Sequence, residues 1–348
     1  MKSKIFNIVV FIFGLAILVW VILDTGPAVL WTKLSSIGWS FVWVVLVYLL
    51  ETVIEVGAWQ LLVPPHRRTG YFRMFAVSQA GAALNGLLPG QTGEVVKGTL
   101  LAGHMKTRWI VSSLLIYNFL FIATTLPVLL ICALTVLISG CLPLNVSLIL
   151  FAAVGLSAIL PTLLFIWIRR GMIGDILRAV KRLPLVGRLI KESLVEEGRR
   201  IDHETRATWK HRPADFMIAA ILLVAARFLG IVEVWLILFL MGSTVSVPMA
   251  AGIFAAGQVF AYATMVLPTS FGVLEGGTKG IFQWFGLAGE IGLSLELVRR
   301  IRKFFFMFVG IICLGLLSIL DPAARRVIGR NSPDDGGSGP EDGPEVNP

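Results

Sequence analysis

Eight charged side chains lie within or beside apolar stretches of the sequence, where charge is unusual. They are Glu51, Glu55, Glu94, Lys97, Arg227, Glu233, Glu275 and Lys279. If these stretches cross a membrane, each charge costs about 2.5–3.5 kcal/mol on insertion scales. The side chains must then pair with one another or face a polar cavity. Because pairing alone does not explain why such costly groups persist, we favour a cavity for a charged head group.

Ion pairing without a further function is the alternative for some of these residues. Glu94 and Lys97 are three residues apart, so both lie on one face of a helix. Glu275 and Lys279 are four residues apart and have the same relationship. The spacing by itself therefore leaves both explanations open for these two pairs.

Two sequences rich in proline and glycine lie next to these acids. The first is LLPGQTGE, with Pro89, Gly93 and Glu94, and the second is LPTSFGVLEGG, with Pro268, Gly272 and Glu275. A helix that begins after such a turn presents free backbone N–H groups and a positive dipole end, which suit a phosphate. The glycines allow close approach of the backbone to a ligand, and close packing between helices is their alternative role.

One ligand could use all of these groups. Lys97, Lys279 or Arg227 would be charge partners of its phosphate. Glu94 and Glu275 would suit a cationic amine on the same ligand, or would couple transport to protons. A zwitterionic or aminoacylated phospholipid offers both charges, so the residues favour a phospholipid partner.

The composition indicates that membrane spans carry these residues. Apolar residues make up 56% of the 348 residues, charged residues 15%, and the mean hydropathy is +0.84. This excludes a soluble enzyme, a disordered protein and a secreted disulfide scaffold. Apolar runs of about 18 residues or more indicate membrane spans, and we predict an all-α polytopic membrane protein. The six predicted full spans are 5–23, 39–63, 110–138, 146–168, 214–241 and 303–320. The first run is longer than the core of a signal peptide and no clear cleavage site follows it, so we interpret it as a retained helix.

Two further apolar stretches, 72–101 and 249–288, contain the proline and glycine turns and do not fit simple spans. Proline and glycine break helices. Non-helical backbone at membrane depth survives where protein or a water-filled cavity covers it. We therefore predict that each stretch is a broken, re-entrant pair of helices.

The two broken stretches are related to each other. At an offset of 179 residues, seven of the 19 positions between 75 and 93 are identical: Phe75, Ala76, Gln79, Ala82, Leu88, Pro89 and Gly93 recur at 254, 255, 258, 261, 267, 268 and 272. The span before each stretch carries an acid, Glu55 or Glu233. Each half, about 1–140 and 141–323, holds an odd number of full spans, so the sequence predicts an inverted repeat. Such repeats with broken helices are characteristic of secondary transporters.

The distribution of charge predicts the orientation. The net charge is +9, and the basic residues lie mainly between apolar runs, which is the pattern of a topology signal and argues against nucleic-acid binding. Lys2 and Lys4 predict that the N-terminus lies in the cytoplasm, and the C-terminus is predicted to lie on the same side. We expect the protein itself to reside in the cell (inner) membrane. A basic cluster at 299–303 disagrees, because it would begin the last span from the outer side. We interpret segment 169–213 as a pair of amphipathic cytoplasmic helices that lie on the inner leaflet. The polar tail, 324–348, is predicted to be disordered.

Other classes of chemistry have no signal in the sequence. The four histidines lie in predicted loops without an HExxH motif, the three cysteines have no metal-binding spacing, and a Walker loop is absent. We therefore expect no cofactor and no metal, and any transport would be passive or coupled to an ion. The sequence carries no signal for an oligomeric state.

The sequences LLPGQTGEVVKG and VLPTSFGVLEGG resemble the paired signatures of the lysylphosphatidylglycerol synthase transmembrane region, or flippase-like domain, family. The resemblance covers about residues 5–320, with Pro89, Gly93 and Glu94 matching the first signature and Pro268, Gly272 and Glu275 the second. It implies a flippase-like domain over residues 1–323 that moves lipids such as aminoacylated phospholipids between leaflets. The polar residues after 320 could not form the soluble aminoacyl transferase domain of the full synthases. The chain thus resembles the stand-alone members, some of which accompany hopanoid or other envelope lipid pathways. A hopanoid or a polyprenyl lipid is therefore a further candidate for the lipid partner.

These observations favour a lipid translocator of the flippase type and not an enzyme. Two alternatives remain open. One is a membrane-embedded head-group transferase that uses Glu94 or Glu275 as a general base. The other is a non-transporting accessory protein of a lipid-synthesis complex, docked through residues 169–213.

Overall fold

The computed structural model describes residues 37–87, 92–157, 212–264 and 273–320, with a few isolated residues elsewhere. The predicted first span (5–23), the fourth span beyond residue 157, almost all of the 169–213 segment and the tail (324–348) lie outside the described residues. So do the two turns, at 88–91 and 265–272. The described ranges are helical and contain no strand, as the sequence predicted.

Within the described part of the chain, three helices are long and apolar enough to cross a membrane. The first begins with the 3-10 turn η1 (Gly38–Ser40) and continues as α3 (Phe41–Leu62); the others are α6 (Thr107–Ser139) and α11 (Pro213–Leu240). They coincide with three predicted spans, at 39–63, 110–138 and 214–241. The protein is therefore a multi-pass membrane protein, with α7 (Leu144–Ser157) at the start of the predicted fourth span.

The last helix, α14 (Gly289–Leu320), begins earlier than predicted. The sequence analysis began this span at residue 303, after a basic cluster of the kind that flanks spans. Leu295 and Val298 are buried and lie on one face of the helix, so apolar packing continues toward its N-terminus. The cluster at 299–303 thus lies inside α14 and not at its end, and it no longer counts as a flanking topology signal.

Each predicted broken stretch forms two helices that pack together. The first stretch contains α4 (Tyr71–Leu87) and α5 (Thr92–Leu101), and the second contains α12 (Val247–Thr264) and α13 (Val273–Trp284). The helices of each pair approach closely at glycine. A Cβ atom on Gly93 of α5 would lie 1.9 Å from the Gly81 carbonyl oxygen of α4, and one on Gly277 of α13 would lie 2.1 Å from the ring of Phe260 on α12.

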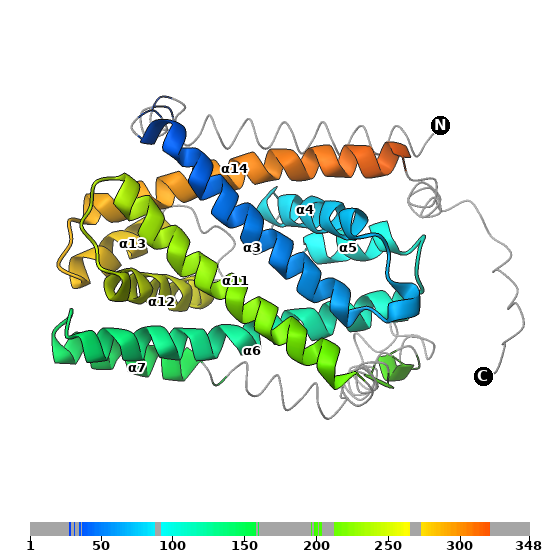
Figure 1. Cartoon of the computed structure of the whole chain (residues 1–348), viewed down its shortest axis with the longest axis horizontal. Helices are drawn as coiled ribbons and strands as arrows, with labels where there is room; N and C mark the ends of the chain where they lie inside the picture. Colours follow the sequence, from blue (N-terminus) through cyan, green and yellow to red (C-terminus); the bar gives the residue numbers. More distant parts are fainter. Residues whose placement is uncertain are drawn as a thin grey trace, which may run out of the picture.

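Figure 1 shows α3 and α11 side by side, crossing in front of the other helices. Helix α14 runs along one edge of the molecule, and α6 and α7 run along the other. The two broken pairs lie between these edges. Helix α4 packs on α14 and α12 packs on α6. Each broken pair therefore packs against the long helix that ends the other half of the chain.

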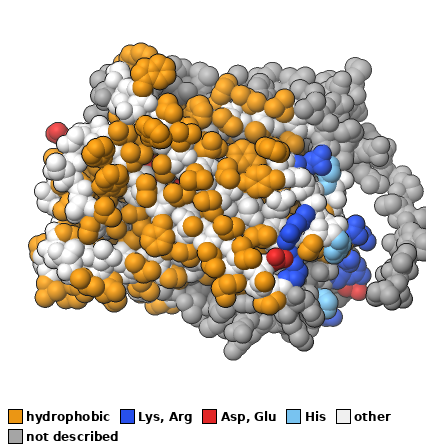
Figure 2. Space-filling view, in the orientation of Figure 1, with side chains coloured by type: hydrophobic (Ala, Val, Ile, Leu, Met, Phe, Trp, Pro, Cys, Tyr) orange, Lys and Arg blue, Asp and Glu red, His pale blue; other side chains and the backbone are white. Residues whose placement is uncertain are grey.

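The two broken pairs begin at opposite ends of the bundle. Gln60, near the end of α3, donates a hydrogen bond to the Thr69 carbonyl just before α4 (2.8 Å). At the other end, Gly252 near the start of α12 lies against Val136 near the end of α6 and against Phe285 just after α13. Figure 2 shows basic side chains gathered at one end and apolar side chains over most of the remaining face. The basic end carries Arg67, Arg68, Lys106, Arg108 and Arg212.

Two apolar clusters hold the broken pairs in place. One packs α12 and α13 against α6 and α11 and buries Phe254 and Phe282. The other packs α4 and α5 against α3 and α6 and buries Trp59 and Met74. Inside a bilayer the lipid tails are as apolar as these side chains, so van der Waals packing rather than the hydrophobic effect drives helix association. This packing fixes the positions of the polar groups on the same helices.

Candidate functional site

Arg227 of α11 is buried against two acids of α3. Its Nη2 atom lies 3.4 Å from Oε1 of Glu51 and also forms an ion pair with Glu55. The guanidinium lies over the ring of Phe121 on α6, 4.1 Å from the ring centroid. Because Glu51 and Glu55 are four residues apart, they lie on the same face of α3. One buried cation is thus shared by two carboxylates.

A second buried ion pair connects α11 to α14. Glu233, further along α11, pairs with Arg302. The two side chains are among the most buried charges of the described residues, at 4% and 7% exposure. The Arg302 guanidinium also lies over the ring of Tyr48 on α3, 3.9 Å from its centroid. This contact brings α3, α11 and α14 together at one point.

A third group of charges lies on α5. Lys97 Nζ is 2.7 Å from Oε1 of Glu94, which is the ion pair that the three-residue spacing predicted. Asn118 of α6 donates a hydrogen bond of 3.4 Å to the other carboxylate oxygen. Lys97 also attracts the Glu55 carboxylate electrostatically. The charges of the first broken pair are thus continuous with the Arg227 cluster.

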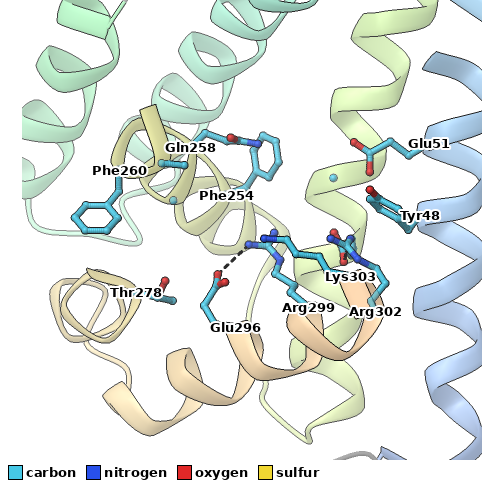
Figure 3. Close-up of a pocket in the computed structure, with 14 residues that line it drawn as sticks. Tyr48, Glu51, Phe254, Gln258, Phe260, Thr278, Glu296, Arg299, Arg302 and Lys303 are labelled. Carbon is cyan, nitrogen blue, oxygen red and sulfur yellow. Dashed lines mark hydrogen bonds and ion pairs between the residues drawn. The ribbon is translucent and has the colours of Figure 1, made fainter. Parts of the chain in front are cut away.

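A cavity of about 210 Å³ opens between α3, α11, α12, α13 and α14. Acids and bases line it in equal number: Glu51, Glu233 and Glu296, and Arg299, Arg302 and Lys303. Figure 3 shows Glu51 and Tyr48 projecting from α3 and the basic side chains from α14. Arg299 Nη1 forms an ion pair with Glu296 Oε1 at 3.2 Å. Gln258 of α12 and Thr278 of α13 add neutral hydrogen-bonding groups.

The structure brings together six of the charged residues singled out in the sequence: Glu51, Glu55, Glu94, Lys97, Arg227 and Glu233. Glu51 and Glu233 line the cavity itself, and the others form the neighbouring charge network. Gly93 contributes close helix packing, since it lies against Gly81, and its backbone N–H donates to Asn85 Oδ1 at 2.6 Å.

The remaining predicted residues are placed elsewhere or fall outside the described part. Lys279 is exposed, lies against Gly289 at the start of α14 and does not line this cavity. Pro89, Pro268 and Gly272 lie outside the described residues, as does the side chain of Glu275.

Sequence reasoning missed Tyr48, Glu296, Arg299, Arg302 and Lys303. The basic residues were interpreted as flanking charge because the last span was begun too late. A signal was available: positions 296, 299 and 303 are spaced by three and four residues, which places them on one face of a helix. A charged face on a helix that continues with apolar residues indicates a buried polar surface rather than a loop.

The charges of this region can bind a charged group but offer no evident metal centre. Within the described residues, no three His, Cys, Asp or Glu side chains are grouped so that they could hold a metal ion. Removing one partner of a buried ion pair is costly, because it leaves the other charge uncompensated. A ligand that carries its own charges could replace one partner of such a pair, so that no buried charge is left without a counter-charge.

Comparison with known protein families finds a model that matches most of the chain. The family model described as "Lysylphosphatidylglycerol synthase TM region" matches residues 5–310. No curated protein and no solved structure matches the chain.

Proposed function

The chain belongs to the lysylphosphatidylglycerol synthase transmembrane region family, and we propose that it is a translocator that moves a lipid with a charged head group between the leaflets of the cell (inner) membrane. Membership of the family supports a membrane lipid-related role. The finer assignment, translocation, rests on the charged cavity between α3, α11 and the second broken pair.

That cavity is the single observation that carries the proposal. It holds three acids and three bases among helices of membrane length. Its volume of about 210 Å³ is below the roughly 300–1,000 Å³ of pockets that enclose a whole drug-sized ligand. A polar head group fits such a space, whereas acyl chains have to stay outside it in the bilayer. Movement of a lipid between leaflets requires this arrangement, with the head group in a polar space and the acyl chains in the bilayer.

The arrangement of the broken pairs supports the same proposal. In this view the α4–α5 and α12–α13 pairs are the re-entrant parts of an inverted repeat, with halves at about 1–140 and 141–323. The turns at Pro89 and Pro268 lie outside the described residues, and the proposal places them near the charged centre, one reached from each membrane face. With both termini in the cytoplasm, the basic end of the bundle faces the cytoplasm. Alternating access to a fixed central site is the mechanism that such repeats serve.

A vesicle assay tests this function. The purified protein is reconstituted into liposomes that carry a fluorescent phospholipid, and the lipid exposed on the outer leaflet is followed by dithionite quenching. The proposal predicts that quenching passes the half-completion set by the outer leaflet, and that thin-layer chromatography finds the lipid unchanged. A head group that is altered would favour the transferase alternative. Unaltered lipid without movement would favour the accessory protein.

A further inference from the structure

Lys303 differs from the other cations of the cavity because the acid that attracts it, Glu296, is already paired with Arg299. Arg299 is paired with Glu296, and Arg302 with Glu233. Lys303 lines the same cavity with an exposed side chain. It forms no ion pair or hydrogen bond with any described residue. The α14 wall of the cavity therefore has one positive charge in excess.

The opposite imbalance exists on α3. Glu51 and Glu55 share the single guanidinium of Arg227, and Glu51 also lines the cavity. Lys97, which attracts Glu55, is already paired with Glu94. The α3 side of the network thus has one negative charge in excess, and Glu51 is the member that reaches the cavity. Figure 3 shows Glu51 and Lys303 on different walls of the same space.

The two excess charges are opposite in sign and lie on different walls. A ligand that neutralises both must carry one negative and one positive group. A group with one charge would leave the other wall uncompensated, which is costly in a site of low polarity. A phosphate diester with a primary ammonium group supplies both charges on a short chain. Gln258 and Thr278 offer hydrogen bonds to its neutral oxygens.

We propose that Lys303 binds the phosphate of a zwitterionic head group and that Glu51 selects for the ammonium group on the same ligand. This inference rests on the proposed function, because it names the class of lipid that the cavity accepts. It assigns the two walls of the cavity to two halves of one head group.

The test compares three fluorescent lipids that share their acyl chains and differ in the head group: phosphoethanolamine (zwitterionic), phosphoglycerol (anionic) and glucosyl (uncharged). In the vesicle assay the parent protein should move the phosphoethanolamine lipid fastest. Lys303→Met should slow both phosphate-bearing lipids at least tenfold, while Lys303→Arg should retain most of the rate. Glu51→Gln should remove the preference for phosphoethanolamine over phosphoglycerol. Lys106→Met, at the basic end, is the matched control and should change none of these rates.

A binding measurement separates this inference from the translocator proposal. Glycerophosphoethanolamine, glycerol phosphate and inorganic phosphate are titrated into the protein in detergent. Glycerophosphoethanolamine should bind more tightly than the two anions, and Lys303→Met should weaken it at least tenfold. If this holds while vesicles show no lipid movement, translocation is wrong and the site remains. If Lys303→Met and Glu51→Gln bind and move lipids as the parent does, or if the parent binds none of the three, the assignment of the walls is overturned.

Discussion

Arg227 of α11 and Glu55 of α3, which are 172 residues apart in the sequence, form an ion pair where the two central helices pack together. The same guanidinium contacts Glu51 at 3.4 Å. The pair joins the first half of the chain to the second, midway along two helices that are long and apolar enough to cross a membrane. It is therefore both a structural connection and part of the charge network beside the cavity.

Removing this cation should destabilise the fold. Arg227→Met leaves Glu51 and Glu55 buried near each other without a partner, and loss of one member of a buried pair costs about 3–5 kcal/mol. We expect a clear fall in the melting temperature of the protein in detergent, with reduced yield. Lys106→Met removes an exposed cation at the basic end and should melt like the parent. Equal melting of both variants would show that Arg227 does not hold α3 and α11 together.

The contact between α4 and α5 gives a second prediction. A Cβ atom on Gly93 would lie 1.9 Å from the Gly81 carbonyl oxygen, whereas a Cβ on Gly98 of the same helix meets nothing within 4 Å. Gly93→Ala should destabilise the protein by about 1–3 kcal/mol through overpacking. Gly98→Ala should be neutral or should stabilise by up to about 1 kcal/mol, since alanine favours helix. Thermal unfolding of the two variants measures the difference, and a Gly93→Ala protein as stable as Gly98→Ala would contradict the packing.

The orientation of the bundle can be tested at its two ends. Lys106 lies between α5 and α6 at the basic end, and Thr244 lies between α11 and α12 at the other. Both side chains are exposed. In a variant without native cysteines, Lys106→Cys should react with an impermeant thiol reagent only from the cytoplasm and Thr244→Cys only from outside. Labelling of both from one face would rule out a bundle that spans the membrane in this orientation.

The apolar spans were predictable because length and hydropathy alone define them. Among the described residues, the three helices that are long and apolar enough to cross a membrane, α3, α6 and α11, agree closely with the predicted ranges. The broken pairs were also predictable, since proline and glycine interrupt each apolar run and leave one helix before the turn and one after it. Helix α14 was not, because its first part carries Arg299, Arg302 and Lys303, and a hydropathy argument ends a span at such a cluster.

The partners of the buried charges could be predicted only where they are local. The pair of Glu94 and Lys97 follows from helical spacing. Arg227 with Glu55, and Arg302 with Glu233, connect positions 172 and 69 residues apart. Their contacts depend on how α3, α11 and α14 pack, which spacing within a single helix does not encode. The cavity is formed by that packing. The sequence therefore indicated that costly charges were buried, but it did not show where they meet.

The cavity itself can be filled without replacing a charge. Gly257 of α12 lines it, and a Cβ at this position meets nothing within 4 Å. Gly257→Leu should therefore fold normally, place an apolar side chain in the space for the head group and reduce lipid movement at least tenfold. Gly155→Leu, on α7, is the matched control, since its Cβ also has open space. Vesicle assays on both variants decide, and full activity of Gly257→Leu would place the lipid route elsewhere.

Glu94 gives the final test of function against structure, because its ion pair with Lys97 fits either. The Glu94 side chain is 22% exposed and also accepts a hydrogen bond from Asn118. If pairing were its only role, Glu94→Gln should fold poorly, and adding Lys97→Met should restore the protein by removing the bare charge.

We expect the opposite pattern. Glutamine keeps the acceptor for Asn118, and Lys97 keeps the Glu55 carboxylate nearby, so Glu94→Gln should insert and melt almost like the parent while lipid movement falls at least tenfold. Adding Lys97→Met should leave the protein inactive, because the lost charge is needed by the ligand and not by the fold. The sequence repeat predicts the same behaviour for Glu275→Gln, with Lys279→Met as its second change. Yield, melting temperature and lipid movement of the single and double variants decide the matter, and activity that returns in either double variant would reduce that acid to a structural partner.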